Sequence, residues 1–166
     1  LAVFTTSYGA EVGVVDAPFG ATHVVSDQRL LGWFDAIHGA GLEAPVVQAP
    51  KHGEHSAAIG AILALDPRPT GVVCFSDVAA GAVIRGALEA GLDVPGDLSV
   101  VGFDGTQRAA YAQPSITTIR QDVAAKGRAA ATLLGERMAG STRRAKRIVL
   151  PVELVVGDST APPNAD

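Results

Sequence analysis

The chain has 166 residues, of which 48% are apolar, with a formal net charge of −4 and a mean hydropathy of +0.27. This length allows one domain with a sizeable core, and the apolar share excludes a disordered chain. The negative charge argues against a nucleic-acid-binding surface on this chain, and no apolar run approaches the ~20 residues of a membrane-spanning helix.

The cysteine content and the start of the chain bear on where the protein works. Cys74 is the single cysteine, so an internal disulfide is excluded and a reducing cytosol is favoured. The sequence has no basic and apolar leader with a small-residue cleavage site, so we expect a cytoplasmic protein. The chain begins at Leu1 and its single methionine is Met138, which suggests a piece of a longer protein.

Strand and helix signals alternate through the first part of the chain. The strands are continuous Val-rich runs rather than alternating ones, which is typical of a sheet with helices on both faces. Repeated βα units predict an α/β fold with a parallel, doubly wound sheet, its strands in the order 2-1-3-4 by appearance. The predicted strands are 11–16, 45–48, 70–75 and 98–103, and the predicted helices are 27–40, 54–65 and 78–90.

The last part of the chain predicts a long helix and a returning strand. Apolar and small residues recur at helical spacing along 122–139, and Gly140 ends the helix. A basic loop follows, then a strand at 148–156 and a polar, Pro-rich tail that we expect to be poorly ordered. The residues on the one narrow helix face are Val123, Gly127, Ala130, Ala131, Leu134 and Met138.

Four polar residues follow strands or open the next helix. Arg29 opens the helix after the first predicted strand, Ser76 and Asp77 follow the third, and Asp104 ends the fourth. Ligands of open α/β sheets bind beyond the carboxyl ends of the strands, where these residues converge. A guanidinium and a carboxylate with hydroxyl neighbours suit a polyhydroxylated or otherwise polar ligand. For Asp77 alone we favour a simpler role as a helix cap.

Other chemistry is poorly supported by the sequence. His52, Glu54 and His55 are residue types that bind zinc, but their spacing fits no helical metal motif, and a polar loop explains them better. Cys74 lies inside an apolar strand, where a thiol is usually inert. Walker loops, GxSxG elbows and paired catalytic carboxylates are absent from the sequence. We therefore expect a binding protein with no metal or cofactor, and not an enzyme.

Two segments carry a specific family resemblance. The run VPGDLSVVGFD at 94–104 and the run PSITTIRQ at 114–121 together resemble the effector-binding domain of the lactose/galactose-repressor family of bacterial transcription regulators. The ending LPVELVVGDST at 150–160 is similar to that of the repressors, although Gly157 replaces an arginine often found there. The resemblance implies the effector-sensing part of a regulator, whose ligand is a sugar or sugar-like molecule. The alternative is a periplasmic sugar-binding protein of a transport system, which shares the fold.

The resemblance also implies a domain organisation. The fold would be periplasmic-binding-protein-like, type I, with the C-terminal subdomain nearly complete at 11–115 and the N-terminal subdomain mostly missing. Residues 1–10 would be the remnant of an N-terminal-subdomain helix, and 116–147 a crossover with a helix of that subdomain. Residues 148–166 would form the returning strand and a flexible tail.

The resemblance assigns roles to six side chains, five in ligand binding and one in the core. Arg29 and Trp33 match an Arg-x-x-Gly-Trp motif, whose arginine typically binds the effector while the tryptophan lies in the core. Ser76 stands where the family often has asparagine, which allows an effector that differs from a typical sugar. Gln121 lies on the crossover, where the family points a polar side chain into the cleft. The implied ligand-binding residues are Arg29, His55, Ser76, Asp104 and Gln121.

Two kinds of partner follow from the resemblance. Operator DNA would be bound only through a headpiece that this chain lacks. A homodimer would form through the helix after the third strand and the segment after the fourth, unless that stripe of small residues packs internally on the sheet. The predicted interface residues are Ala79, Val83, Gly86, Ala110 and Tyr111.

Overall fold

The computed structural model describes residues 1–7, 11–15, 24–50, 55–142, 144 and 146–162. The strands are β1 Ala2–Ser7, β2 Gly13–Val15, β3 Val46–Pro50, β4 Gly71–Cys74, β5 Ser99–Asp104, β6 Thr117–Gln121 and β7 Val152–Val155. The helices are α1 Val24–Gly39, α2 Ser56–Leu63, α3 Asp77–Glu89, α4 Gln107–Ala110 and α5 Val123–Met138. All seven strands join one sheet in the order β2-β3-β1-β4-β5-β6-β7.

The five inner strands are parallel, as the repeated βα units predict. β3, β1, β4, β5 and β6 pair in parallel, whereas β2 and β7 pair antiparallel at the two edges. The carboxyl ends of the five parallel strands consequently lie along one edge of the sheet, which is the edge where ligands bind in open α/β folds.

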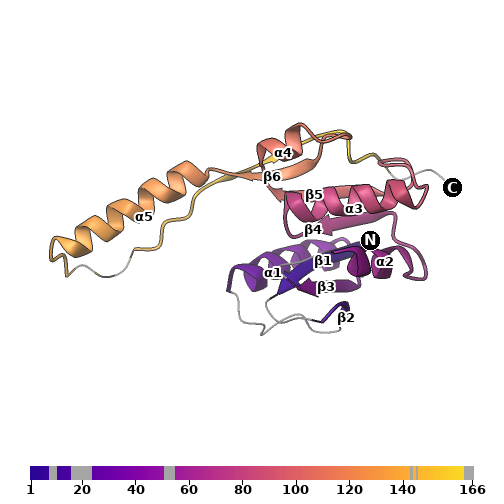
Figure 1. Cartoon of the computed structure of the whole chain (residues 1–166). Helices are drawn as coiled ribbons and strands as arrows, with labels where there is room; N and C mark the ends of the chain where they lie inside the picture. The colour runs from indigo at the N-terminus through magenta and orange to yellow at the C-terminus, as the bar shows by residue number, and fades with distance from the viewer. Residues whose placement is uncertain (8–10, 16–23, 51–54, 143, 145, 163–166) are drawn as a thin grey trace.

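Helices cover both faces of the sheet, as predicted. Side chains alternate between faces along β1, and neighbouring Val3 and Phe4 are both fully buried. Phe4 belongs to the core under α2 and α3, whereas Val3 packs with Leu30 and Ile37 of α1. Figure 1 shows α1 on one side of the strands and α3 on the other. The doubly wound α/β prediction is therefore confirmed.

The prediction for residues 1–10 is wrong in its secondary structure. This segment was expected to be the remnant of a helix, but Ala2–Ser7 forms β1, which pairs with β3 on one side and β4 on the other. Val, Phe and Thr fit a pleated, buried surface, and only a central strand buries both of its faces. β1 therefore takes the central place, between β3 and β4, that was predicted for the strand at 11–16.

The strand predicted at 11–16 forms, but in another place. β2 covers only Gly13–Val15 and pairs antiparallel with β3 at the edge of the sheet. Val14 is 53% exposed there, because a strand at the edge of a sheet is covered less completely than a central one. The apolar run was correctly interpreted as a strand, and its central, parallel position was not. Residue 16 lies outside the described residues.

The C-terminal elements form as predicted, although the returning strand is shorter than 148–156. α5 spans Val123–Met138, and no residue of α5 is buried against the described part of the chain. Figure 1 shows α5 extending away from the other elements, to which it is joined through β6 and the segment that leads to β7. Its apolar face, including Leu134 and Met138, is exposed.

The segment after β7 is bonded to the sheet up to the start of the predicted tail at residue 161. Ser159 is fully buried, and its hydroxyl donates to the carbonyl oxygen of Val100 at 2.6 Å and accepts from the amide of Thr117 at 2.9 Å. The amide of Ala161 also donates to the Ser99 hydroxyl at 3.1 Å. These bonds fasten the segment to the amino ends of β5 and β6. Residues 163–166 lie outside the described residues.

Candidate functional site

Polar residues gather where the parallel strands end. Ser76 lies two residues after the end of β4, Asp104 is the last residue of β5, and Gln121 is the last residue of β6. Arg29 comes from α1, which covers the face of the sheet that Val3 occupies. The candidate site is thus built by four separate elements at the carboxyl edge.

The guanidinium group of Arg29 lies between two aromatic rings. Its central carbon is 4.4 Å from the centroid of the Phe75 ring and 3.5 Å from that of Phe103. The group also donates a hydrogen bond to the carbonyl oxygen of Phe75. A cation over aromatic faces is attracted by the negative ring surface, and the rings restrict its rotation. Arg29 is therefore held in place before any ligand binds.

Burial opposes both charges of the site. It lowers the pKa of Arg29, an effect that the nearby negative charge of Asp104 partly offsets. It raises the pKa of Asp104, and the positive charge of Arg29 again acts in the opposite direction. A partly dehydrated cation and anion that interact in this way strengthen hydrogen bonds to a polar ligand, because less water competes for them.

Asp104 has an unusual backbone and a fixed side chain. Its φ of 115° falls in a region that residues other than glycine rarely adopt, and such conformations cluster at functional sites. Its Oδ1 accepts a hydrogen bond of 2.9 Å from Nε2 of Gln121. Oε1 of Gln121 in turn accepts from Nζ of Lys126 in α5, at 3.5 Å. The crossover therefore places a polar side chain directly against the carboxylate.

Ser76, and not Asp77, has the capping role that the sequence predicts for Asp77. Ser76 is the residue that caps α3, because its hydroxyl accepts from the amide of Ala79 at 3.2 Å. The expectation that Asp77 caps the helix is wrong. Its carboxylate accepts instead from the hydroxyl of Thr118 at 2.5 Å and from the amide of Thr106 at 2.7 Å.

His55 makes no described contact with Arg29, Ser76, Asp104 or Gln121. Its ring packs edge-on against Phe4, with centroids 5.5 Å apart, and its buried Nε2 has no hydrogen-bond partner. It borders a groove of about 880 Å³ between α2, α3 and α4. The described residues contain no group of three potential metal-ligating side chains, and residues 52–54 lie outside them. Other side chains along the groove include Val78, Arg85, Glu89 and Arg108.

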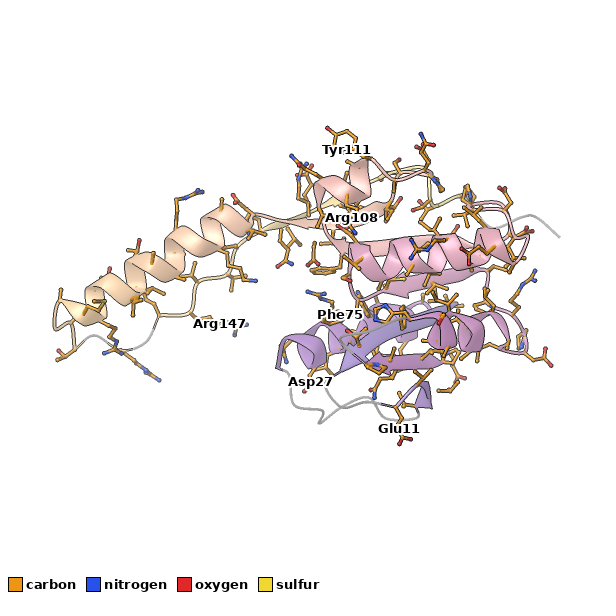
Figure 2. All side chains as sticks on the ribbon, in the orientation of Figure 1. Glu11, Asp27, Phe75, Arg108, Tyr111 and Arg147 are labelled. Atoms are coloured by element: carbon orange, nitrogen blue, oxygen red, sulfur yellow. The ribbon has the colours of Figure 1, made fainter. Side chains whose placement is uncertain are left out.

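The predicted dimer stripe packs mostly inside the chain. Ala79 and Val83 are buried in the core beneath α3, so they cannot form a surface. A Cβ atom on Gly86 would lie 2.5 Å from a methyl group of Ile59, so this glycine allows α2 to approach α3. The alternative of internal packing is therefore confirmed for these three residues. Ala110 is exposed, and Tyr111 projects outward beyond α4 (Figure 2).

Comparison with known proteins agrees with this architecture. A protein-family model described as a periplasmic binding protein-like domain matches residues 13–160. The chain belongs to this family. None of the described helices is long and apolar enough to cross a membrane.

The relatives of this periplasmic-binding-protein-like chain are transcription regulators. An HTH-type regulator of Streptomyces limosus is 42% identical over 148 residues, which cover 84% of this chain and 41% of that protein. A LacI family regulator from Mycobacterium smegmatis has a TM-score of 0.81 at 29% identity, covering 98% of this chain and 58% of that one. A regulator named CelR, solved as a cellobiose complex, has a TM-score of 0.79 at 29% identity, covering 95% of this chain and 46% of that one. The chain spans less than half the length of the Streptomyces limosus regulator.

Sequence reasoning missed the aromatic residues of the site. Val73 of β4 pairs with Val101 of β5, so Phe75 and Phe103, each two positions further on, share one face at the end of neighbouring strands. Trp33 packs against the core beneath α1, as predicted for it. A Phe directly before the polar residue in both strands was the available signal.

The raised pKa of Asp104 has a consequence for stability. The folded chain binds this proton more tightly than the unfolded chain, so its stabilising effect is present in acid and lost as pH rises through the folded pKa. Asp104→Asn keeps an acceptor for Gln121 without the charge. It should raise the melting temperature at pH 7 by no more than a few degrees, because water screens the charge of a carboxylate that is only partly buried.

Thermal unfolding followed by circular dichroism from pH 7 down to the ordinary carboxyl range checks this expectation. The gain should shrink as the pH falls, because the wild-type carboxyl becomes neutral. Asp35→Asn, on the exposed surface of α1, should leave the melting temperature unchanged. A lower melting temperature for Asp104→Asn at pH 7 contradicts the assignment.

Proposed function

We propose that this chain is the effector-sensing part of a bacterial transcription regulator, and that a small polar ligand binds at the carboxyl edge of its sheet. The observation that carries the proposal is the Arg29 guanidinium, fixed between Phe75 and Phe103 beside the Asp104 carboxylate. Ser76 and Gln121 complete the proposed contacts. Binding rather than catalysis is proposed, and a cytoplasmic location, because the relatives are transcription regulators.

The chemistry of the site favours a carbohydrate. A guanidinium can donate two parallel hydrogen bonds to the oxygens of adjacent hydroxyl groups, and a carboxylate can accept hydrogen bonds from two such groups. Together they match the hydroxyl groups of a sugar ring. Phe103 adds an apolar surface beside the guanidinium. The similar regulator CelR was solved with cellobiose, which supports a sugar as the ligand class. Because Ser76 caps α3, it offers a ligand less reach than an asparagine.

We further propose that the ligand bridges two lobes. β1 to β5 with α1 to α4 would form one lobe, and α5 would belong to the other, reached through β6 and β7. α5 has an exposed apolar face and no buried residue among those described, which supports a partner lobe. Closure would be a population shift driven by the ligand's preference for one arrangement, and it would alter operator binding by the DNA-binding part of the longer regulator.

Sugar binding to this chain tests the proposal. With a single lobe, we expect dissociation constants in the millimolar range for at least one of cellobiose, lactose and maltose. Arg29→Ala and Asp104→Ala should each weaken this binding about tenfold or more, because a hydrogen bond to a charged group contributes about 1.5–3 kcal/mol. The fluorescence of Trp33, the sole tryptophan and one turn after Arg29, provides the measurement.

Arg85→Ala is the matched control, since it removes a guanidinium that borders the α2–α3 groove instead. Its sugar affinity should equal that of the wild type. In the longer regulator, the two site variants should bind operator DNA normally but fail to respond to the sugar. Wild-type affinity in both site variants would show that the site is misplaced. No binding of any of the three sugars would contradict the expectation that one lobe holds them in the millimolar range.

We also propose that two copies of the chain associate through the outer surface of α3 and α4. Tyr111 is 83% exposed and Val78 and Leu88 are also exposed, which places large apolar groups on this surface. Interfaces are enriched in such aromatic anchors, and two-fold association is the commonest assembly of soluble proteins.

Sedimentation equilibrium tests the association. The wild-type chain should be a dimer at micromolar concentration, and Tyr111→Glu should shift it to monomer because a charge is buried at the interface. Val149→Glu, at a site 77% exposed and remote from α3, should remain dimeric. A wild-type chain that is monomeric throughout, or two variants that behave alike, would refute the proposed surface.

A further inference from the structure

Asp77 is a buried carboxylate that the proposed ligand contacts do not use. Its side chain is 1% exposed, and two hydrogen bonds account for both of its oxygens. The Thr118 hydroxyl donates to Oδ1 at 2.5 Å, and the Thr106 amide donates to Oδ2 at 2.7 Å. Burying a carboxylate is unfavourable unless it is well bonded, so a residue of this kind in the core calls for a specific role.

The hydrogen bonds of Asp77 join three segments that are far apart in sequence. Each segment carries one residue of the proposed site within three positions. Ser76 directly precedes Asp77, Asp104 lies two residues before Thr106, and Gln121 lies three residues after Thr118. The Thr118 hydroxyl also accepts from the amide of Gly105 at 3.3 Å. One carboxylate and one hydroxyl therefore connect the loop after β4, the loop after β5 and the crossover strand β6.

Two glycines allow these segments to pack closely around the carboxylate. A Cβ atom on Gly102 would lie 2.5 Å from Oδ1 of Asp77. A Cβ atom on Gly105 would lie 2.5 Å from the Cα atom of Arg120, in a residue whose φ is +69°. Both close approaches require glycine, because any larger residue needs the backbone to shift.

We propose that Asp77 is a positioning residue of the site. It holds the loop after β5 and the crossover together, and so keeps Asp104 and Gln121 in contact. The inference rests on the proposed function, because it assigns Asp77 to that same site. Asp104 has a rarely adopted φ of 115°, and such a conformation persists only where the surrounding structure holds it. The amides of the next two residues are bound by Thr118 and Asp77, which supply that restraint.

The role depends on an acceptor at both oxygens. The partners of Asp77 are an amide and a hydroxyl that both act as donors toward it. Asp77→Asn removes the charge and replaces one acceptor by an NH₂ group, so the Thr118 hydroxyl, which already accepts from Gly105, can no longer donate there and would have to accept a second bond. Thr118→Val removes the hydroxyl but keeps the shape, and Thr118→Ser restores the hydroxyl. Ser115→Ala is the matched control, since it removes a hydroxyl bonded to Asp158 before the start of β6.

Nuclear magnetic resonance of the whole chain without ligand reads the effect directly. Asp77→Asn and Thr118→Val should speed exchange of the Gln121 side-chain NH₂ protons with water by about tenfold or more, the factor expected when a bond to a charged group is lost. Thr118→Val should also raise the pKa of Asp104 further, because the hydrogen bond from Gln121 that lowers this pKa is lost. Asp77→Asn is read by the Gln121 signal alone, since the charge of Asp77 itself raises the pKa of Asp104. Thr118→Ser and Ser115→Ala should resemble the wild type in both signals.

Two outcomes overturn the proposal. Asp77→Asn and Thr118→Val could lower stability while the Gln121 exchange rate stays at its wild-type value in both variants, in which case Asp77 only supports the core. Thr118→Ser could also fail to restore signals lost in Thr118→Val. Comparison of Thr118→Val with Thr118→Ser tests the proposal even if Asp77→Asn does not fold. Because no ligand is present, failure of sugar binding sinks the proposed function without altering these readings.

Discussion

Parallel pairing of β1, β4, β5 and β6 aligns their carboxyl ends, and every part of the candidate site depends on that alignment. The register that pairs Val73 with Val101 sets Phe75 and Phe103 side by side, and the pairing of Asp104 with Arg120 brings Gln121 next to the carboxylate. A shift of one residue would turn each of these side chains to the opposite face. The arrangement of the candidate site is thus set first by the register of the sheet, and only then by the loops.

That alignment brings charges into a partly buried edge, which opposes folding. Arg29 is stabilised there by two aromatic rings and a carbonyl oxygen, and Asp77 by two hydrogen-bond donors. Asp104 is less well compensated, because burial raises its pKa and its backbone occupies a rare conformation. Sites that bind ligands commonly carry such a local cost, since the groups are arranged for the ligand rather than for the empty protein.

The sequence predicted the elements well and their positions less well. β4, β5 and α3 follow from apolar runs and from glycines that end helices, and the place of the candidate residue Asp104 follows from its position at the end of β5. Arg29 reaches the same edge from α1, although β2, the strand that it was expected to follow, is antiparallel. The run at 11–16 is as apolar as a central strand, yet β2 lies at an edge, because position in a sheet depends on available partners. The role of Asp77 depends on Thr106 and Thr118, contacts of high sequence separation that no local pattern contains.

The central claim is that a sugar binds at the carboxyl edge of the sheet, between the loops after β4 and β5 and the crossover. The most direct measurement is the change in backbone amide chemical shifts of the chain as cellobiose, lactose or maltose is added. The account predicts that shifts concentrate at Phe75–Asp77, Asp104–Thr106 and Thr118–Gln121, with the α2–α3 groove unaffected. Shifts confined to the groove around Arg85 and Glu89, or absent for all three sugars, would contradict it.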